Sequence, residues 1–457
     1  MFFVPQKSIS LSRTYIPIAM EPSRHTPIAS LERTLALLFF AFLALIFLVP
    51  ERALAFQDNG DGFLSYRGEV EGASSGKSLV FAALNVEGTN ISTITNTEGN
   101  FLIKVPREMG DRNLLVSFLG YRTRSIPLSS LEGENNKITL TVSVTELSEI
   151  NINAPKDAQA LIREVMAKKG EKYIGSPTVM TAFYRETIKK RRRNVSLSEA
   201  VVTIYKTPYD SPREDAMELY KARKSTDYNK LDTVALKLQG GPYNTLFVDV
   251  MKYSQYIFAE EDLSNYRFTF DRSTMINDRP IYVIKFIQHQ SITDPLYQGE
   301  LFVDVRNKTL TTAIFSLNIT DREKAADLFV RRKPAKVDVW PTEVAYRVDY
   351  RVKDGKWYYG YSSVNMEFKV DWADKWFNSV YSMSAEMAIT DWEVSPSGDL
   401  PRYRARIKKS IILNDEAVGF SDPGFWGEYN IIEPEKSIES AIRKIQRQLR
   451  RDQRNGD

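Results

Sequence analysis

The chain has 457 residues, of which 43% are hydrophobic and 26% charged, so it is long enough for two or three folded domains. It contains no cysteine, which excludes disulfides, thiolate metal sites, cysteine nucleophiles and a lipid-modified cysteine. With two histidines, His25 and His289, and a formal net charge of +4, the composition predicts neither a histidine-based metal site nor a nucleic-acid partner.

The N-terminal part contains an uninterrupted apolar run, Leu35–Val49. The run is shorter than the roughly 20 residues that a membrane-spanning helix needs. It follows Arg24 and Arg33 and precedes Ala53–Ala55, an order typical of a secretory signal peptide. We therefore expect residues 1–55 to be a signal peptide, with an uncleaved anchor as the alternative, and the rest of the chain to be exported.

Short apolar runs alternate with turn residues in residues 63–152. Seven short strands at this spacing predict a small β-sandwich. The expected strands are Tyr66–Val70, Leu79–Val86, Ile91–Thr95, Asn100–Val105, Leu114–Phe118, Arg122–Pro127 and Lys137–Val142.

Two stretches of this unit carry more specific motifs. Thr95–Phe101 places a turn glycine two residues before an aromatic residue, and Leu114–Tyr121 ends a buried strand in Gly-Tyr. With Gly68–Val70 and Leu84–Thr89, they resemble the carboxypeptidase D regulatory-like domain, a transthyretin-like or Ig-like sandwich. The resemblance implies a folding and docking module of Gram-negative envelope proteins, located in the periplasm or at the outer membrane, and implies no peptidase activity.

A linker helix is predicted over residues 155–170. Asn153 can cap it and Pro155 can occupy its first position. Its apolar stripe consists of Ala158, Leu161, Ile162, Val165 and Met166. Such an amphipathic helix is expected to cover the core of the next domain, with binding of a partner as the alternative.

Residues 178–430 predict a large antiparallel β-meander with a few α-helices, so that the whole chain is mainly β. Its first hairpin flanks a cationic turn, Lys189–Arg193, and its register places Arg185 opposite Glu199. This pair is expected to stabilise the sheet, with a charged pair inside a ligand cavity as the alternative. The cationic turn is expected to be solvated, with contact to anionic lipid as the alternative.

A second hairpin, Tyr346–Tyr361, turns at Asp354-Gly355, the strongest short-range hairpin signal. One face is aromatic and branched apolar, with Trp357, Tyr359 and Tyr361 on its second strand. The other face carries Arg347, Asp349, Arg351 and Tyr358. The apolar phase then shifts by one residue, which predicts a bulge near Ser362-Ser363.

Three further stretches of the large domain resemble known families. The hairpin Tyr297–Leu317, for which we predict Val303 opposite Thr312, resembles a repeated element of LolA-like half-barrels, the periplasmic lipoprotein carriers. Phe183–Glu186 and Phe425–Ile431 are similar to marks of a family of envelope proteins named for their carboxypeptidase-like regulatory domain. The resemblance implies a half-barrel-like sheet in an envelope protein.

Two segments near the C-terminus stand out by composition. The connection Asp371–Phe377 contains Trp372 and Trp376, which are expected either to plug the sheet or to form an exposed ligand or membrane contact. Residues 435–457 predict a basic amphipathic helix, docked on the sheet or lying on a membrane surface.

Signals for catalysis are weak. His289 is not accompanied by a G-x-S-x-G motif, no phosphate loop or dinucleotide motif occurs, and no spacing singles out a carboxylate pair. The available carboxylates are Asp294, Glu300, Asp304, Asp371 and Asp391. We expect no catalytic residue, no metal and no cofactor.

These observations predict an exported, non-catalytic cell-envelope protein that binds an apolar ligand, such as a lipid, or an envelope or outer-membrane protein. The candidate ligand-binding residues are Trp357, Tyr359, Tyr361, Trp372, Trp376, Arg185 and Glu199. The alternative is a secreted hydrolase that uses carboxylates or His289.

Overall fold

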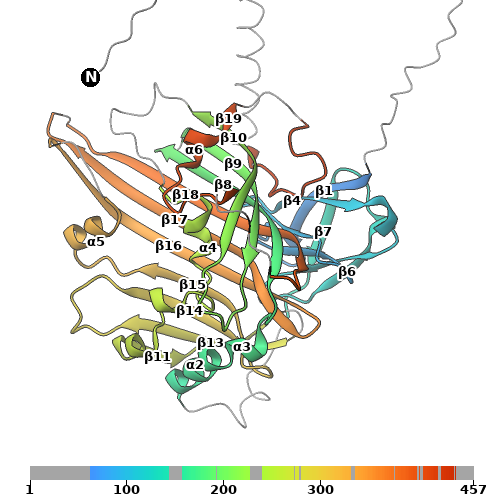
Figure 1. Ribbon diagram of the computed structural model, residues 1–457, viewed down its shortest axis with the longest axis horizontal. Helices are drawn as coiled ribbons and strands as arrows, with labels where there is room; N and C mark the ends of the chain where they lie inside the picture. The colour runs from blue at the N-terminus through green and yellow to red at the C-terminus, as the bar shows by residue number, and fades with distance from the viewer. Residues whose placement is uncertain are drawn as a thin grey trace, which may run out of the picture. The chain divides into compact units, whose positions relative to one another are not determined.

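The computed structural model describes residues 62–438 apart from 144–156, 192, 227–238, 272, 277–278, 331–334, 375, 399–400, 402–404, 420–423 and 437. The fold is mainly β, as the sequence predicts, with a small sandwich followed by one large sheet (Figure 1). The predicted signal peptide, residues 1–55, and nearly all of the predicted C-terminal helix lie outside the described residues. In the described part of the chain, no helix is long and apolar enough to span a membrane.

The sandwich consists of a three-stranded sheet, β4-β1-β7, and a four-stranded sheet, β3-β2-β5-β6. Its strands are β1 (Phe63–Gly72), β2 (Ala83–Val86), β3 (Ser92–Ile94), β4 (Asn100–Pro106), β5 (Asn113–Ser117), β6 (Arg124–Pro127) and β7 (Asn136–Leu140). Alternate residues point into one apolar core, as Leu84 and Val86 do on β2 and Leu114 and Val116 on β5. The residues between them, such as Asn85, therefore face away from this core.

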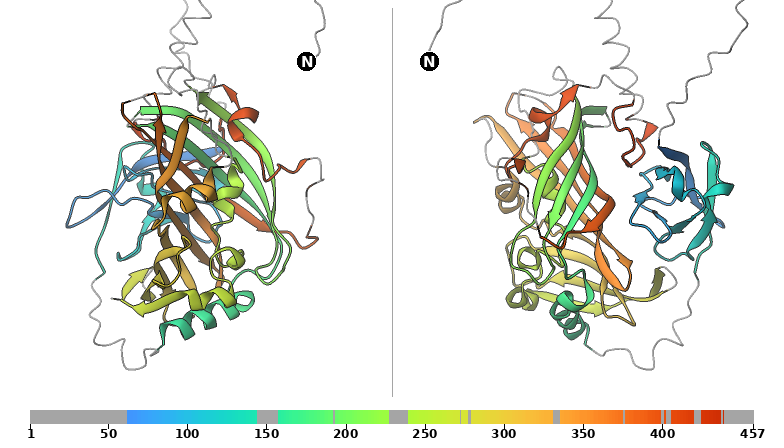
Figure 2. Two further views of the ribbon diagram at one scale, coloured as in Figure 1. Left: turned by 90° about the vertical axis from the view of Figure 1, so that its left-hand side faces the viewer. Right: turned by 45° about the vertical axis from the view of Figure 1, so that its right-hand side comes forward.

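The large sheet follows the order β11-β13-β14-β15-β16-β17-β18-β8-β9-β10-β19, and β12 pairs with β13. It is antiparallel except where β19 joins β10, and it is strongly twisted (Figure 2). The strands are β8 (Thr178–Lys190), β9 (Arg193–Lys206), β10 (Ala216–Thr226), β11 (Tyr266–Phe270), β12 (Thr274–Ile276), β13 (Arg279–Gln288), β14 (Tyr297–Asp304), β15 (Leu310–Leu317), β16 (Val337–Lys353), β17 (Lys356–Trp372), β18 (Ser379–Val394) and β19 (Val418–Gly419).

Of the strand registers predicted from the sequence, some agree with the structure and others do not. The β8–β9 register is as predicted, with Arg185 opposite Glu199. The predicted β14–β15 register is wrong, because the turn is centred earlier than predicted and places Val303 opposite Leu310 rather than Thr312; a bulge between Phe302 and Val303 follows this pair.

The β16–β17 hairpin also contains an irregularity. Tyr350 pairs with Tyr359, but Asp349 pairs with Tyr361, so Gly360 is the extra residue. The bulge therefore comes before the predicted position, and it places Tyr361 on the opposite face from Tyr359.

Short helices pack against the sheet. They are α2 (Ala158–Ala167), α3 (Lys169–Lys172), α4 (Pro242–Leu246), α5 (Arg322–Phe329) and α6 (Leu413–Glu416), with 3-10 turns η1 (Arg107–Met109), η2 (Leu128–Ser130), η4 (Ser254–Tyr256) and η5 (Glu260–Asn265). Asp157 caps α2 by accepting a hydrogen bond from the Ala160 amide, whereas the predicted cap, Asn153, lies outside the described residues.

Both faces of the large sheet are covered, as the alternation along β8 shows. Ala182 and Tyr184 belong to the main core, to which α2 and α4 contribute. Phe183 points the other way and packs in a cluster with Ile94 of the sandwich and Trp426. The strands at the centre of the sheet are therefore apolar on both sides.

Candidate functional site

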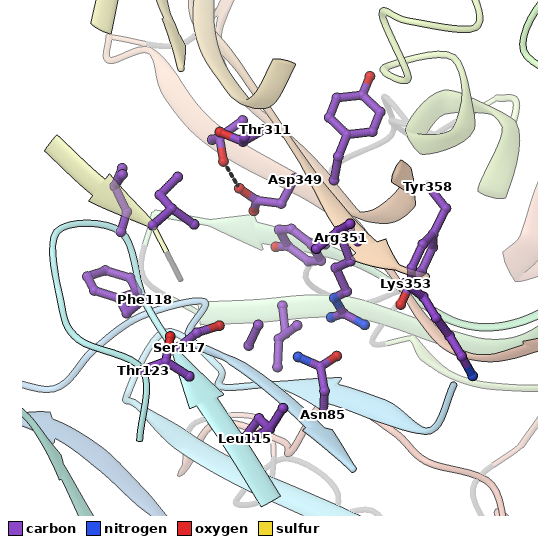
Figure 3. Close-up of a pocket in the computed structure, with 18 of the residues that line it drawn as sticks. Asn85, Leu115, Ser117, Phe118, Thr123, Thr311, Asp349, Arg351, Lys353 and Tyr358 are labelled. Carbon is purple, nitrogen blue, oxygen red and sulfur yellow. Dashed lines mark hydrogen bonds between the residues drawn. The ribbon is translucent and has the colours of Figure 1, made fainter. Parts of the chain in front are cut away.

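A pocket of about 440 Å³ lies between β2 and β5 of the sandwich and β16 of the large sheet (Figure 3). On the sandwich side it is lined by residues that face away from the sandwich core, including Asn85, Leu115 and Ser117. On the sheet side it is lined by the polar face of the central hairpin. The sequence therefore predicted the polar face of the hairpin, but not that the sandwich lies against it.

The apolar wall of the pocket includes two aromatic rings in contact. The rings of Phe81 and Tyr361 lie 5.2 Å apart, and Leu115 and Phe118 lie nearby in the lining. Phe81 has a φ of 64°, a conformation that is costly for a bulky residue. Such strain is concentrated at functional sites.

The polar wall contains Arg351, which is only 8% exposed. Its guanidinium donates hydrogen bonds to Ser92 Oγ and to the carbonyl oxygens of Ile389, at 3.1 Å, and Thr93, at 3.5 Å. Among the described residues, no carboxylate forms an ion pair with Arg351. Burial lowers the pKa of Arg351, while Tyr358, which also hydrogen-bonds to it, and the charge of Asp349 act in the opposite direction, so Arg351 is a buried cation with no carboxylate paired directly to it.

The other two arginines of the pocket wall are paired with carboxylates. Asp349 accepts hydrogen bonds from Arg347 Nε at 2.7 Å and from Thr312 Oγ1 at 2.8 Å. Arg279 lies 3.4 Å from a carboxylate oxygen of Asp304. Arg351 therefore differs from the other two arginines of this wall.

The three predicted aromatic residues of β17 do not share a surface. Tyr361 lines the pocket, whereas Trp357 and Tyr359 belong to the main core on the opposite face. All three are buried. Their proposed role in ligand binding stays a prediction, with Tyr361 the member that reaches a pocket.

Arg185 and Glu199 come together in a buried ionic network. Arg185 Nε lies 2.8 Å from Glu199 Oε1, and Arg223 Nη2 lies 2.8 Å from Glu199 Oε2. Arg185 also reaches Glu386 at 3.3 Å and donates to the Ile432 carbonyl at 2.6 Å. Burial works against the charge of Arg185, but Glu199 and Glu386 raise its pKa, so its charge is locally compensated.

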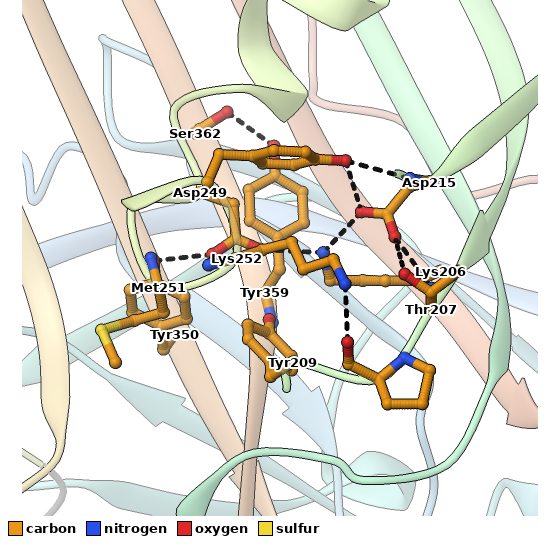
Figure 4. A network of polar contacts seen from close by, with 12 residues as sticks. Lys206, Thr207, Tyr209, Asp215, Asp249, Met251, Lys252, Tyr350, Tyr359 and Ser362 are labelled. Atoms are coloured by element: carbon orange, nitrogen blue, oxygen red, sulfur yellow. Dashed lines mark hydrogen bonds and ion pairs between the residues drawn. The ribbon is translucent and has the colours of Figure 1, made fainter. Parts of the chain in front are cut away.

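A second buried network lies on the opposite face (Figure 4). Lys206 Nζ lies 2.9 Å from Asp215 and 2.7 Å from Asp249. Tyr253 donates a hydrogen bond to Asp215 and Tyr350 donates one to Asp249, each at 2.8 Å. The network fixes the segment that contains α4 and η4 against the sheet, with Lys206 between the two carboxylates.

The sequence did not predict this second network. Each of its acids and its lysine stands in a different segment, so no spacing brought them together. Nearby, burial lowers the pKa of Lys252 to about 8, while its ammonium donates to the carbonyls of Pro208 and Ser211 at 2.6 and 2.7 Å.

The two predicted tryptophans at the end of β17 and in the β17–β18 turn differ in exposure. Trp372 ends β17 and is partly buried, packed near Phe329 and Val370. Trp376 is 96% exposed and its neighbour Phe377 is 80% exposed. The plug alternative is therefore wrong for Trp376 and Phe377.

The residues considered for hydrolysis are spread over several local structures. His289 is exposed after β13, and Asp294 pairs with Lys324 on the surface. Asp304 is buried and accepts from the backbone amides of Arg306 and Asn307. In the described part of the chain, no group of three or more acidic or histidine side chains is arranged to hold a metal ion.

Comparison with known proteins identifies the N-terminal sandwich. Residues 66–152 match the CarboxypepD_reg-like domain. The match confirms the resemblance on which the sequence analysis of this unit depends, and it covers the sandwich rather than the large sheet. No curated protein matches the chain.

Several solved structures are distantly similar to this chain. A domain assigned to outer membrane lipoprotein sorting, from Vibrio parahaemolyticus, is 13% identical, with 52% of this chain and 92% of that chain covered and a TM-score of 0.22. A DUF1329 family protein from Desulfovibrio piger is 10% identical, with 52% and 90% covered and a TM-score of 0.21. Lipovitellin is 6% identical, with 50% and 27% covered and a TM-score of 0.25. These scores are too low to support a shared function.

Proposed function

We propose that this protein is an exported cell-envelope binding protein that holds an amphipathic molecule in the pocket beside Arg351. The apolar part of the ligand packs against Phe81, Leu115 and Tyr361, and its anionic head group pairs with Arg351. The observation that carries this proposal is the buried Arg351 guanidinium, which has hydroxyl and carbonyl partners but no carboxylate.

The physical reason is the cost of burying a charge. An unpaired buried ion loses several kcal/mol of hydration, and paired or hydrogen-bonded partners offset that loss. A carboxylate or phosphate brought by a ligand supplies the missing partner for Arg351. The wall of Phe81 and Tyr361 supplies apolar area for the rest of the molecule, and the volume lies within the range of small-molecule sites.

Support for export comes from the sequence. The apolar run Leu35–Val49, the basic residues before it and Ala53–Ala55 after it form the pattern of a secretory signal. A CarboxypepD_reg-like domain follows directly. We infer that the ligand is a component of the envelope, such as a lipid or fatty acid.

The test is native mass spectrometry of the purified secreted protein, with solvent extraction of whatever it carries. We expect a stoichiometric, extractable anionic amphiphile that is lost in Arg351→Met. The control, Arg267→Met, removes an exposed arginine of β11 and should retain the ligand.

Two outcomes would contradict the proposal. One is an empty protein that stays empty after incubation with envelope lipids, and the other is equal loading of the wild type and Arg351→Met. A stable complex with an envelope protein and no bound amphiphile would support an adaptor role in place of ligand binding.

A further inference from the structure

Two turns that are far apart in the sequence lie at the same end of the large sheet. The β8–β9 turn contains Lys189–Arg193, and the β17–β18 turn contains Trp376. They are neighbours because β18 pairs with β8, with Tyr381 opposite Lys190, and the Arg191 amide donates to the Val380 carbonyl at 2.8 Å. In Figure 1 the orange strands β17 and β18 run out to this end of the sheet.

The β17–β18 turn presents the two most exposed large apolar side chains in the described part of the chain. Trp376 is 96% exposed and Phe377 is 80% exposed. Exposing two adjacent large apolar side chains almost fully to water is thermodynamically unfavourable, whereas isolated, partly exposed apolar side chains are common on protein surfaces. This pair therefore indicates a surface that is covered in use.

The surroundings of this aromatic pair are cationic. Residues 189–193 and 371–378 together contain six Lys and Arg residues against two Asp residues, and Lys189 Nζ lies 3.7 Å from Glu435 Oε2. Arg191 and Arg193 are exposed and form no ion pair with any residue that the structure describes. Lys336 also lies at this end, because its carbonyl accepts from the Ala373 amide at 3.1 Å.

We propose that this end of the sheet, which we call the basic aromatic tip (Arg191, Arg193, Trp376 and Phe377), docks on the surface of an anionic lipid bilayer. Tryptophan and phenylalanine enter the boundary between head groups and acyl chains, and the surrounding cations attract anionic head groups. Neither the aromatic pair nor the cations alone are sufficient for stable attachment, since stable anchoring takes an apolar and an electrostatic contribution together.

The tip is separate from the pocket beside Arg351, and the two proposals can fail independently. Residues 61–457 form a compact unit of their own. The test therefore uses the chain from Phe56, which excludes the apolar run that would itself bind lipid. The probe is sedimentation with vesicles of phosphatidylcholine, alone or mixed with phosphatidylglycerol.

The wild type should sediment with the mixed vesicles and much less with phosphatidylcholine alone. Trp376→Ser combined with Phe377→Ser should weaken binding by about tenfold or more, because burying one large apolar side chain contributes that much. Arg191→Asn combined with Arg193→Gln should weaken it by about tenfold; asparagine suits the φ of 56° at Arg191.

The matched control for charge is Arg163→Gln with Arg267→Gln, which removes two exposed cations in α2 and β11. This control should bind vesicles as the wild type does. The proposal is overturned if the wild type does not bind, if either tip pair has no effect, or if the charge control weakens binding as much as the tip variants. Far-ultraviolet circular dichroism of each variant shows that the fold is retained.

Discussion

Two buried arginines on the face of the large sheet opposite α4 are held in different ways. Arg185 on β8 has Glu199 at 2.8 Å and Glu386 at 3.3 Å, so its charge is compensated within the protein. Arg351 on β16 is also almost fully buried, but its partners are the hydroxyl groups of Ser92 and Tyr358 and two carbonyl oxygens. The pKa of the first is raised by its carboxylates, and the pKa of the second is lowered by burial.

Under the proposed function, this difference separates a structural ion pair from a binding site. A compensated buried charge contributes to a specific fold, and removing one partner leaves another ion uncompensated. A buried charge that has no counter-ion costs stability in the empty protein and favours an anionic ligand. Substitutions in the two networks should therefore have different consequences.

The largest effect is expected at Glu199, which lies between Arg185 and Arg223. Glu199→Gln leaves both guanidinium groups buried with less negative charge nearby. We expect the free energy of unfolding to fall by about 3–5 kcal/mol, measured by urea denaturation. Glu343→Gln, an exposed position on β16, is the control and should change it by less than about 0.5 kcal/mol. If Glu199→Gln and Glu343→Gln change the free energy of unfolding equally, then Glu199 does not stabilise Arg185, and the contrast between Arg185 and Arg351 fails.

A second prediction concerns the neighbour of Arg185 on the same strand. Glu186 points to the opposite face, accepts a hydrogen bond from Tyr184 at 2.8 Å, and has its pKa raised to about 7 by burial. Its ordinary value is 4.5, so between these values the folded state binds a proton that the unfolded state does not. Stability from this group is complete below pH 4.5 and is lost as the pH rises through 7.

Glu186→Gln removes this dependence. Relative to the variant, the wild type should lose roughly 3 kcal/mol of unfolding free energy between pH 4.5 and a pH above 7. Urea denaturation at several pH values measures the difference. Parallel stability curves for the two proteins would show that Glu186 is ionised in the folded state like an exposed carboxylate.

The smallest stability effect is expected at Arg351, although the site is buried. Arg351→Met removes an uncompensated cation and adds apolar volume, so the unfolding free energy should change by no more than about 1 kcal/mol. The matching change Arg185→Met removes a partner of Glu199 and Glu386 and should cost clearly more. If both substitutions destabilise equally, Arg351 is a structural residue.

Local patterns in the sequence predicted much of the fold. The seven sandwich strands and the β8–β9 register, including Arg185 opposite Glu199, depend on alternation and turns over short distances. Registers failed where the turn was misplaced, as between β14 and β15, and where a bulge intervened, as at Gly360, because a shift of one residue reverses every later side chain.

The candidate site could be predicted only in part. Arg351 was placed on a polar face of the central hairpin, but one of its hydroxyl partners is Ser92, which is 259 residues away in the sequence. The periodicity of apolar residues along a chain cannot predict a contact between two domains that are so far apart in the sequence. The same holds for the basic aromatic tip, where β18 returns to pair with β8.

The most direct test of the account is a titration of the delipidated protein with dodecanoate and with dodecanol, followed by calorimetry. The two ligands share one alkyl chain and differ in head-group charge. We predict that dodecanoate binds at least about tenfold more tightly, and that Arg351→Met removes this preference while leaving dodecanol binding unchanged. Equal affinity of the wild type for the two ligands, or a preference that survives in Arg351→Met, would contradict the assignment of Arg351 as the head-group site.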